Sequence, residues 1–143
     1  MTPTRILFLC IGNSARSQMA EALANAWAGG RLAAASAGSR PVERVNPLAV
    51  AAVAELGIAM ERAYPKHLDR FAAEAWDYVV TVCDEEGEAC PVFPGPAVRI
   101  HWSIQDPAAV TGATEDQMRA FRTVRDTIGQ HLRDLLSGIR IDA

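Results

Sequence analysis

The sequence predicts a single-domain α/β protein: an open four-stranded parallel sheet with helices on both faces. Short apolar runs alternate along the chain with segments of helical periodicity, which is the pattern of a parallel sheet with crossover helices. The first run is apolar almost throughout, as in a strand buried on both faces. The length of 143 residues suits one domain, which we expect to span residues 1–143.

The first strand is expected at residues 5–10 and the first helix at 17–27. Residues 5–10 form the apolar run, and a segment containing Gly12 ends it. Between 17 and 27, apolar side chains recur at steps of three and four, which is typical of a helix with one buried face. The glycine pair at 29–30 favours a helix end there.

The next elements alternate in the same way. A weaker strand is expected at residues 32–37. A helix follows from Asn46 and Pro47, because Asn caps helix N-termini and Pro fits the first turn. Residues 68–75 are expected to form a short helix.

The second half of the chain completes the predicted sheet. Residues 77–82 are rich in β-branched side chains and predict the clearest strand. A brief strand is expected at 97–100 and a loop at 101–112. Residues 114–138 carry an apolar stripe at helical spacing and predict a long final helix.

Composition excludes several classes of protein. Half of the residues are apolar and 22% are charged, which describes a globular chain and not a disordered one. The net charge of −3 offers no excess of positive charge to phosphates, so we expect no nucleic-acid partner. No apolar run approaches the ~20 residues that cross a bilayer, and the first residues have the wrong flanks for a signal peptide. We therefore expect no membrane association and a cytoplasmic location.

Chemistry-bearing residues follow the predicted strands. Parallel sheets bind ligands at the carboxyl ends of their strands, and Cys10, Cys83 and the loop after Ile100 all fall at such ends. A thiol and a guanidinium, Cys10 and Arg16, flank one tight turn that leads into a helix. The sequence therefore predicts a ligand site at this edge of the sheet.

The turn after the first strand predicts an oxyanion site. Gly12 is expected to allow a sharp turn, so that loop amides and the helix N-terminus converge on a tetrahedral anion. Arg16 can bind two oxygens at once, and the positive field favours a thiolate at Cys10. The alternative is a buried cysteine with an unrelated surface arginine. The loop residues of this site are Ile11, Gly12, Asn13, Ser14, Ala15, Arg16 and Ser17.

The sequence resembles the low-molecular-weight protein tyrosine phosphatase family, and within it the thioredoxin-coupled arsenate reductases. The resemblance covers nearly the whole chain and implies that family's fold. It is carried by residues 10–22, Ser36-Ala37-Gly38, Asn46-Pro47, residues 80–83, Cys90-Pro91, His101-Trp102, Asp106-Pro107 and residues 121–126.

The second and third cysteines separate the two activities. A phosphatase needs one thiol, whereas reduction of arsenate takes two electrons, which a dithiol supplies on forming a disulfide. The resemblance implies a relay in which Cys10 attacks arsenate, Cys83 attacks Cys10 and releases arsenite, and Cys90 attacks Cys83. The product is a Cys83–Cys90 disulfide for thioredoxin to reduce. The polar spacer at 84–89 allows the two thiols to stand apart or to close.

The residues alone leave other interpretations of these thiols open. Cys83 could be a small core residue and Cys90 a loop thiol. A zinc site is disfavoured, because the spacing exceeds the usual two to four residues between zinc cysteines and no fourth ligand is obvious. We therefore expect no metal.

The loop near residue 106 supplies the expected acid. The resemblance makes Asp106 the general acid that protonates the departing oxygen. Pro107 disfavours a helical conformation at Asp106 and stiffens the loop. An ordinary Asp-Pro turn is the alternative. Trp102 is expected to pack, and the family scheme gives His101 no catalytic role.

Polar side chains are expected to support the oxyanion loop. Asn13 is expected to hold backbone carbonyl groups of the loop. The hydroxyl of Ser17 is expected to stabilise the Cys10 thiolate, and that of Ser14 to act similarly.

A cation position beside the loop is also implied by the resemblance. Some reductases of the family hold potassium there, and Asn13, Glu21 and Ser36 match three of its ligand positions. The fourth ligand is an Asp in those relatives, whereas residues 64–67 contain none here. Our hypothesis is that the ammonium of Lys66, the only lysine, takes the cation's place and pairs with Glu21. A solvated surface lysine is the alternative.

Together these features predict an arsenate reductase for arsenic detoxification. We expect arsenate as substrate, with phosphate or sulfate as competing oxyanions, and a monomer without a tightly bound cofactor. Electrons are expected from thioredoxin, and ultimately from NADPH through thioredoxin reductase. The alternative is a tyrosine phosphatase that uses Cys10, Arg16 and Asp106 alone, and weak phosphatase activity could coexist with reduction. A third possibility is an oxyanion-binding or redox-sensing regulator.

Overall fold

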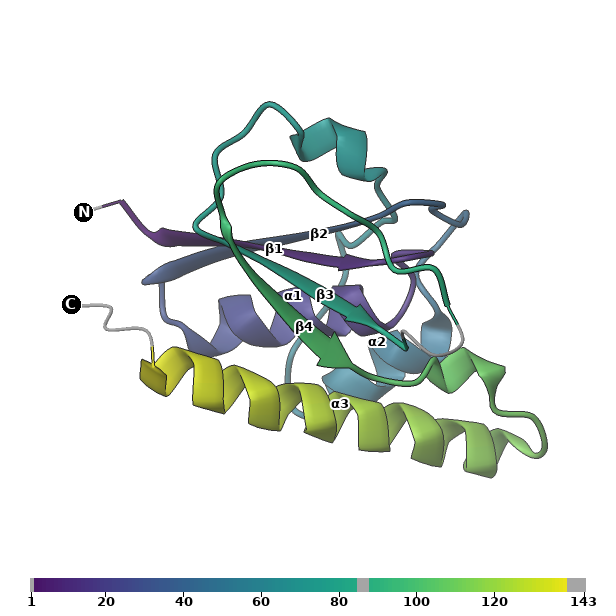
Figure 1. Ribbon diagram of the computed structural model, residues 1–143. Coiled ribbons are helices and arrows are strands. Elements are labelled where there is room, and N and C mark those ends of the chain that lie inside the picture. The colour runs from purple at the N-terminus through teal and green to yellow at the C-terminus, as the bar shows by residue number, and fades with distance from the viewer. Residues whose placement is uncertain (1, 85–87, 139–143) are drawn as a thin grey trace.

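A four-stranded parallel sheet forms the centre of the protein (Figure 1). The computed structural model describes residues 2–84 and 88–138, so residues 1 and 139–143 of the expected domain lie outside it. The strand order is β2-β1-β3-β4, and every neighbouring pair is parallel. The strands are β1 (Thr4–Cys10), β2 (Leu32–Gly38), β3 (Tyr78–Cys83) and β4 (Val98–Ser103).

Three α-helices pack together on one face of the sheet, as Figure 1 shows. A 3-10 helix, η1, and nearby loops cover the other face. The predicted four-stranded parallel α/β domain is confirmed, but in the described residues the second face carries the 3-10 helix η1 in place of an α-helix. The helices are α1 (Arg16–Trp27), α2 (Pro47–Ala54) and α3 (Thr114–Gly138), and the 3-10 helices are η1 (Leu68–Phe71) and η2 (Pro107–Ala109).

The apolar run of β1 is buried because it faces both layers. Ile6 and Phe8 point into the core shared with the helices, whereas Leu7 and Leu9 contact the second apolar cluster. All four side chains are fully buried. This double burial fixes β1 at the centre of the sheet and thereby positions Cys10 at its carboxyl end.

Two elements differ from the sequence prediction. β4 runs to Ser103, so His101 and Trp102 belong to a strand and not to a loop. Residues 98–103 alternate apolar and polar side chains, a two-residue period that the shorter prediction overlooked. The helix expected at 68–75 is only the 3-10 helix η1, which ends at Phe71; the carbonyl of Phe71 accepts hydrogen bonds from the Glu74 amide and the Trp76 indole.

The helix expected after Asn46 forms as predicted. The side chain of Asn46 accepts a hydrogen bond from the amide of Leu48 at 2.9 Å, and Pro47 occupies the first turn. Among the helices in residues 2–84 and 88–138, none combines the length and apolar character needed to cross a membrane.

Gly38, at the end of β2, lies directly against the loop that follows β1. A Cβ atom at this position would collide with the carbonyl oxygen of Ile11 and lie 3.0 Å from the amide nitrogen of Asn13. The loop after Cys10 can therefore approach β2 only because residue 38 has no side chain.

We predict that Gly38→Ala lowers the free energy of unfolding by about 1–3 kcal/mol, because the new methyl group meets backbone that cannot move away freely. Chemical denaturation of the two proteins measures the difference. Gly12→Ala is the matched control, since its Cβ would make only ordinary van der Waals contacts, with the Val42 side chain at 3.5 Å and the Ser14 Cβ at 4.0 Å. Equal losses in the two variants would contradict this account of Gly38.

Candidate active site

The Cys10 thiol lies at the bottom of a loop formed by residues 11–15. Cys10 is the last residue of β1 and is buried. Its Sγ accepts a hydrogen bond from the amide of Asn13 at 3.2 Å and lies 2.8 Å from the Ser17 hydroxyl. The amide and hydroxyl at this sulfur can stabilise negative charge on it.

The turn of the loop falls at Asn13, where φ is 51°, and Gly12 has an ordinary φ. This corrects the expectation that Gly12 provides the sharp turn; Asn is among the few residues that tolerate this conformation. Asn13 also does not hold loop carbonyls through its side-chain amide. Its Nδ2 donates to the hydroxyls of Ser17 at 2.8 Å and Ser36 at 3.0 Å, and its Oδ1 accepts from the Lys66 amide.

Two further side chains near the loop differ from the expectation. The hydroxyl of Ser14 donates a hydrogen bond to the carbonyl of Arg44 at 3.2 Å and not to the Cys10 sulfur. Gln18, which the sequence analysis missed, donates from Nε2 to Asn13 and to the carbonyl of Tyr64. Gln18 is almost completely buried in the first turn of α1, but no local pattern marks it, because its Tyr64 partner is distant in sequence.

Arg16 is buried and forms a two-pronged ion pair with Glu88. Its two terminal nitrogens donate to the two carboxylate oxygens at 2.5 and 2.8 Å, and one of them also donates to the carbonyl of Ile104. Burial lowers the pKa of Arg16. The hydrogen bond to Glu88 and the nearby Cys10, Glu88 and Asp106 charges outweigh burial, so the net shift in its pKa is upward.

Glu88 was not among the predicted site residues. The Arg16 hydrogen bonds lower its pKa, against the opposing effect of burial, and the amide of Asp84 donates a further hydrogen bond at 2.9 Å. A carboxylate and a tetrahedral oxyanion present similar pairs of oxygens to a guanidinium. Glu88 therefore occupies the side of Arg16 that an oxyanion would need.

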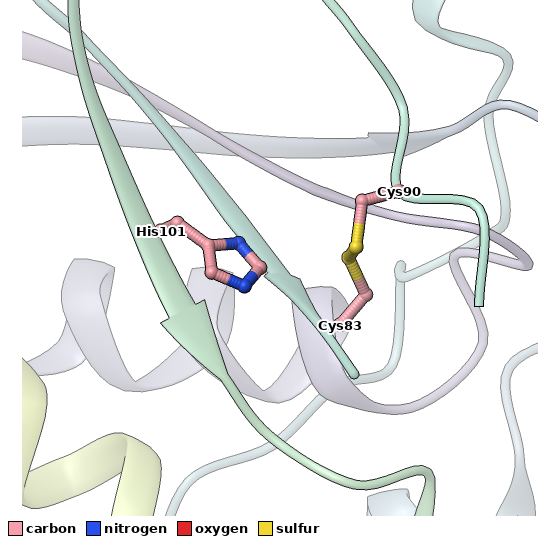
Figure 2. A group of neighbouring side chains, drawn as sticks. All are labelled: Cys83, Cys90 and His101. Carbon is pink, nitrogen blue, oxygen red and sulfur yellow. A yellow bond between two sulfur atoms is a disulfide. The ribbon is translucent and has the colours of Figure 1, made fainter. Parts of the chain in front are cut away.

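Cys83 and Cys90 form a disulfide (Figure 2). Cys83 is the buried last residue of β3, Cys90 is partly exposed, and their Cα atoms are 6.1 Å apart. The alternatives of a plain core residue and an unrelated loop thiol are therefore wrong. Of the spacer between them, residues 85–87 lie outside the described part of the chain.

The first two cysteines of the predicted relay end neighbouring strands. The register of β1 and β3 pairs Leu9 with Thr81, so Cys83 lies one residue beyond the level of Cys10. Neighbouring strands are about 4.8 Å apart. The fold therefore brings Cys10 and Cys83 to the same edge of the sheet.

His101 lies beside the disulfide, on the adjacent strand β4. Figure 2 shows its ring directed toward Cys83 and Cys90. Its Nδ1 lies 2.6 Å from the Thr81 hydroxyl, and a ring nitrogen and both sulfurs lie within 4.8 Å of one another. The sequence analysis missed this proximity because it placed His101 in a loop after a shorter strand.

Asp106 begins the 3-10 helix η2 and is half-buried. Its backbone is extended, as Pro107 favours, and its Oδ1 accepts from the amide of Ala108 at 3.0 Å. Its charge contributes to the upward shift in the pKa of Arg16, so the two groups are close enough to interact electrostatically. Trp102 packs between Phe8 and His131, in the packing role that the sequence predicts.

A comparison with known families gives a match over nearly the entire chain. The profile described as "Low molecular weight phosphotyrosine protein phosphatase" matches residues 5–143. The chain belongs to this family. Cys10, Arg16 and Asp106 thus lie in a family fold that spans the whole described structure.

Relatives within this phosphatase family include arsenate reductases. A curated relative from Halalkalibacterium halodurans, named arsenate reductase, is 39% identical over 128 residues, covering 90% of this chain and 91% of its own. The structure of "an arsenate reductase in the phosphate binding state" matches with a TM-score of 0.79 and 29% identity, covering 95% of this chain and 98% of that one. A thioredoxin-dependent arsenate reductase of Corynebacterium glutamicum matches with a TM-score of 0.74 and 29% identity, covering 97% of this chain and 63% of that one.

Lys66 lies beside the loop, near Glu21 and Ser36, which the resemblance links to a cation position. Its Nζ lies 3.8 Å from Glu21 and donates to the carbonyl of Tyr64 at 3.0 Å, and its side chain is only 9% exposed. Burial lowers the pKa of Lys66, Glu21 opposes this shift, and Arg70 adds to it. Ser36 donates to the same Glu21 oxygen at 2.8 Å. The alternative of a solvated surface lysine is therefore wrong.

Proposed function

We propose that this protein is an arsenate reductase in which Cys10, Cys83 and Cys90 act in series. The observation that carries the proposal is the Cys83–Cys90 disulfide on the strand next to Cys10. The arsenate reductases among its relatives support the same activity. A one-thiol phosphatase would not need the second and third sulfurs.

In the first step, the Cys10 thiolate attacks the arsenic of arsenate. The Asn13 amide and the Ser17 hydroxyl stabilise the thiolate, and Arg16 binds two oxygens of the substrate. Asp106 donates a proton to the departing oxygen, which leaves as water. The product is a covalent bond between Cys10 and arsenic. Phosphate and sulfate, which offer similar oxygens, compete for the same loop.

The next two steps move two electrons. The Cys83 thiolate attacks the sulfur of Cys10, and the electron pair of the sulfur–arsenic bond stays with arsenic, which leaves as arsenite. Cys90 then attacks Cys83, which releases the Cys10 thiolate and leaves the Cys83–Cys90 disulfide. The partly exposed Cys90 makes this disulfide accessible to a reducing partner.

The reducing partner that we propose is thioredoxin. The related arsenate reductase from Corynebacterium glutamicum is thioredoxin-dependent. A dithiol protein such as thioredoxin reduces an accessible disulfide by thiol–disulfide exchange. Electrons then come from NADPH through thioredoxin reductase, with no cofactor held by this chain. We place the reaction in the cytoplasm, where such systems keep thiols reduced. We also propose a monomer, since one chain supplies every site residue.

Phosphatase activity is the second candidate, because the family profile and the Cys10, Arg16 and Asp106 set favour it. These three residues suffice for phosphoester hydrolysis, since water can clear a phosphocysteine. We propose it as a weak side activity. It also provides an internal control, because it uses the first thiol without the other two.

We predict that Cys83→Ser and Cys90→Ser each abolish multiple-turnover arsenate reduction and keep p-nitrophenyl phosphate hydrolysis. Cys10→Ser abolishes both activities, because it removes the nucleophile. A coupled assay with arsenate, thioredoxin, thioredoxin reductase and NADPH, run beside phosphate release, measures the two reactions. Sustained turnover of Cys90→Ser with thioredoxin would overturn the relay order. If the unaltered protein binds arsenate without turnover, it is a regulator and not an enzyme.

We predict that Glu88→Gln strengthens phosphate binding by the disulfide form by about tenfold or more, because the anion no longer has to displace a paired carboxylate from Arg16. Isothermal titration of the oxidised protein with phosphate gives the dissociation constant. The exposed Glu43→Gln variant is the charge-matched control. If both variants bind phosphate like the unaltered protein, Glu88 does not compete with the anion.

We propose that the ammonium of Lys66 replaces the potassium ion of related reductases. Exchanging sodium for potassium at constant ionic strength is then expected to leave arsenate reduction unchanged. In Lys66→Ala, which opens the position beside Glu21, potassium is expected to restore activity better than sodium. A several-fold stimulation of the unaltered protein by potassium would contradict the proposal.

A further inference from the structure

We propose that the reduced protein binds one Zn²⁺ ion through Cys83, Cys90 and His101. The side chains come from the end of β3, the segment after it and the neighbouring strand β4 (Figure 2). Two thiolates and one imidazole are ligands that zinc prefers. A zinc site with three protein ligands keeps a fourth position for water.

The three ligand atoms already lie close enough to share an ion. The two sulfurs and a ring nitrogen of His101 are within 4.8 Å of one another. Bonds of about 2.3 Å to sulfur and 2.0–2.1 Å to nitrogen place tetrahedral ligands roughly 3.5–3.8 Å apart. Reduction frees the sulfurs to separate to that distance, and a small side-chain rotation brings the imidazole in.

The third ligand is what the sequence could not provide. The thiol spacing alone argues against zinc, because it is wide and no further ligand is near in the chain. The parallel pairing of β3 with β4 sets Thr81 beside His101, and the contact at 2.6 Å keeps the imidazole ring on the side of the sheet where the sulfurs lie. A pre-positioned ligand binds a metal with less loss of side-chain freedom.

The surroundings give an ion access to the cluster. Cys83 is buried, but Cys90 is partly exposed and His101 is exposed. A cavity of about 290 Å³ opens beside them, lined in part by Thr81, Pro91 and His101. Solvent can therefore reach the fourth position of the ion.

Zinc binding to the reduced protein exchanges protons for the metal ion and changes no oxidation state. Each thiol loses a proton as it becomes a thiolate ligand, so one Zn²⁺ replaces two protons. The disulfide form has no thiolates to offer, and metal binding is therefore confined to the reduced protein. As a consequence that rests on the proposed function, zinc would hold the second and third sulfurs of the relay and block arsenate reduction.

Titration with Co²⁺, a coloured substitute for zinc, tests the site directly. The reduced Cys10→Ser protein, which retains two thiols, is titrated anaerobically, and Zn²⁺ is then added as competitor. We expect one equivalent of Co²⁺ with thiolate charge-transfer bands and the visible bands of a tetrahedral ion, all removed by Zn²⁺. The oxidised protein is expected to show none of these bands.

His101→Ala separates a three-ligand site from simple binding by two thiols. We expect it to weaken Co²⁺ binding at least about tenfold. Loss of a residue that merely orients a metal ligand weakens binding by about that factor, and loss of the ligand itself should cost no less. His101→Gln is expected to weaken Co²⁺ binding equally. Because glutamine keeps more of the side-chain volume, this second variant guards against a loss caused by disturbance of the strand. His67→Ala, another exposed histidine, is the matched control and is expected to bind normally.

Two results would overturn the proposal. One is the absence of thiolate–Co²⁺ bands in the reduced protein. The other is Co²⁺ affinity in both His101 variants that equals the affinity of the protein with His101 intact, which would mean that the dithiol binds metal without the imidazole. Neither measurement involves arsenate or thioredoxin, so failure of the zinc site and failure of the proposed reductase activity are distinguishable.

Discussion

The parallel pairing of β1 with β3 is the constraint on which the site depends. It brings the carboxyl ends of two strands, far apart in sequence, to one edge of the sheet, so that Cys10 and Cys83 end neighbouring strands with an offset of one residue. The pairing is held by β1, whose apolar side chains are buried on both faces. A sulfur relay requires direct bonds between successive sulfurs, and neighbouring strands, about 4.8 Å apart, bring the backbone at their ends close enough for a local rearrangement to join two such sulfurs.

The segment that follows β3 connects the sulfur chemistry to the anion loop. It begins at Cys83, carries Glu88 and reaches Cys90, so closing the disulfide also fixes where the Glu88 carboxylate lies. That carboxylate neutralises Arg16, whose burial would make the loss of its partner costly. The redox state of two sulfurs and the electrostatics of the oxyanion site are thus coupled through a few residues of chain. The same strand end presents its sulfurs to His101 on β4.

Local patterns predicted much of the structure, and tertiary contacts account for the rest. The buried strands and the Asn46 cap are visible in the sequence because neighbouring residues determine them. The disulfide followed from a family resemblance and not from spacing. Glu88, Gln18 and His101 escaped because each meets its partner only after distant segments have folded together. The left-handed turn at Asn13 escaped because glycine is the more common residue at such turns, and the loop contains one.

Trapping the first sulfur–sulfur bond tests the central claim most directly. Cys90→Ser protein, fully reduced, is given one equivalent of arsenate, blocked with an alkylating agent and digested with trypsin, which separates Cys10 in residues 6–16 from Cys83 in residues 71–99. The account predicts a disulfide between these two peptides in mass spectrometry, together with one equivalent of arsenite. Arsenite formed while both cysteines remain alkylated, or a crosslink that never involves Cys10, would contradict it.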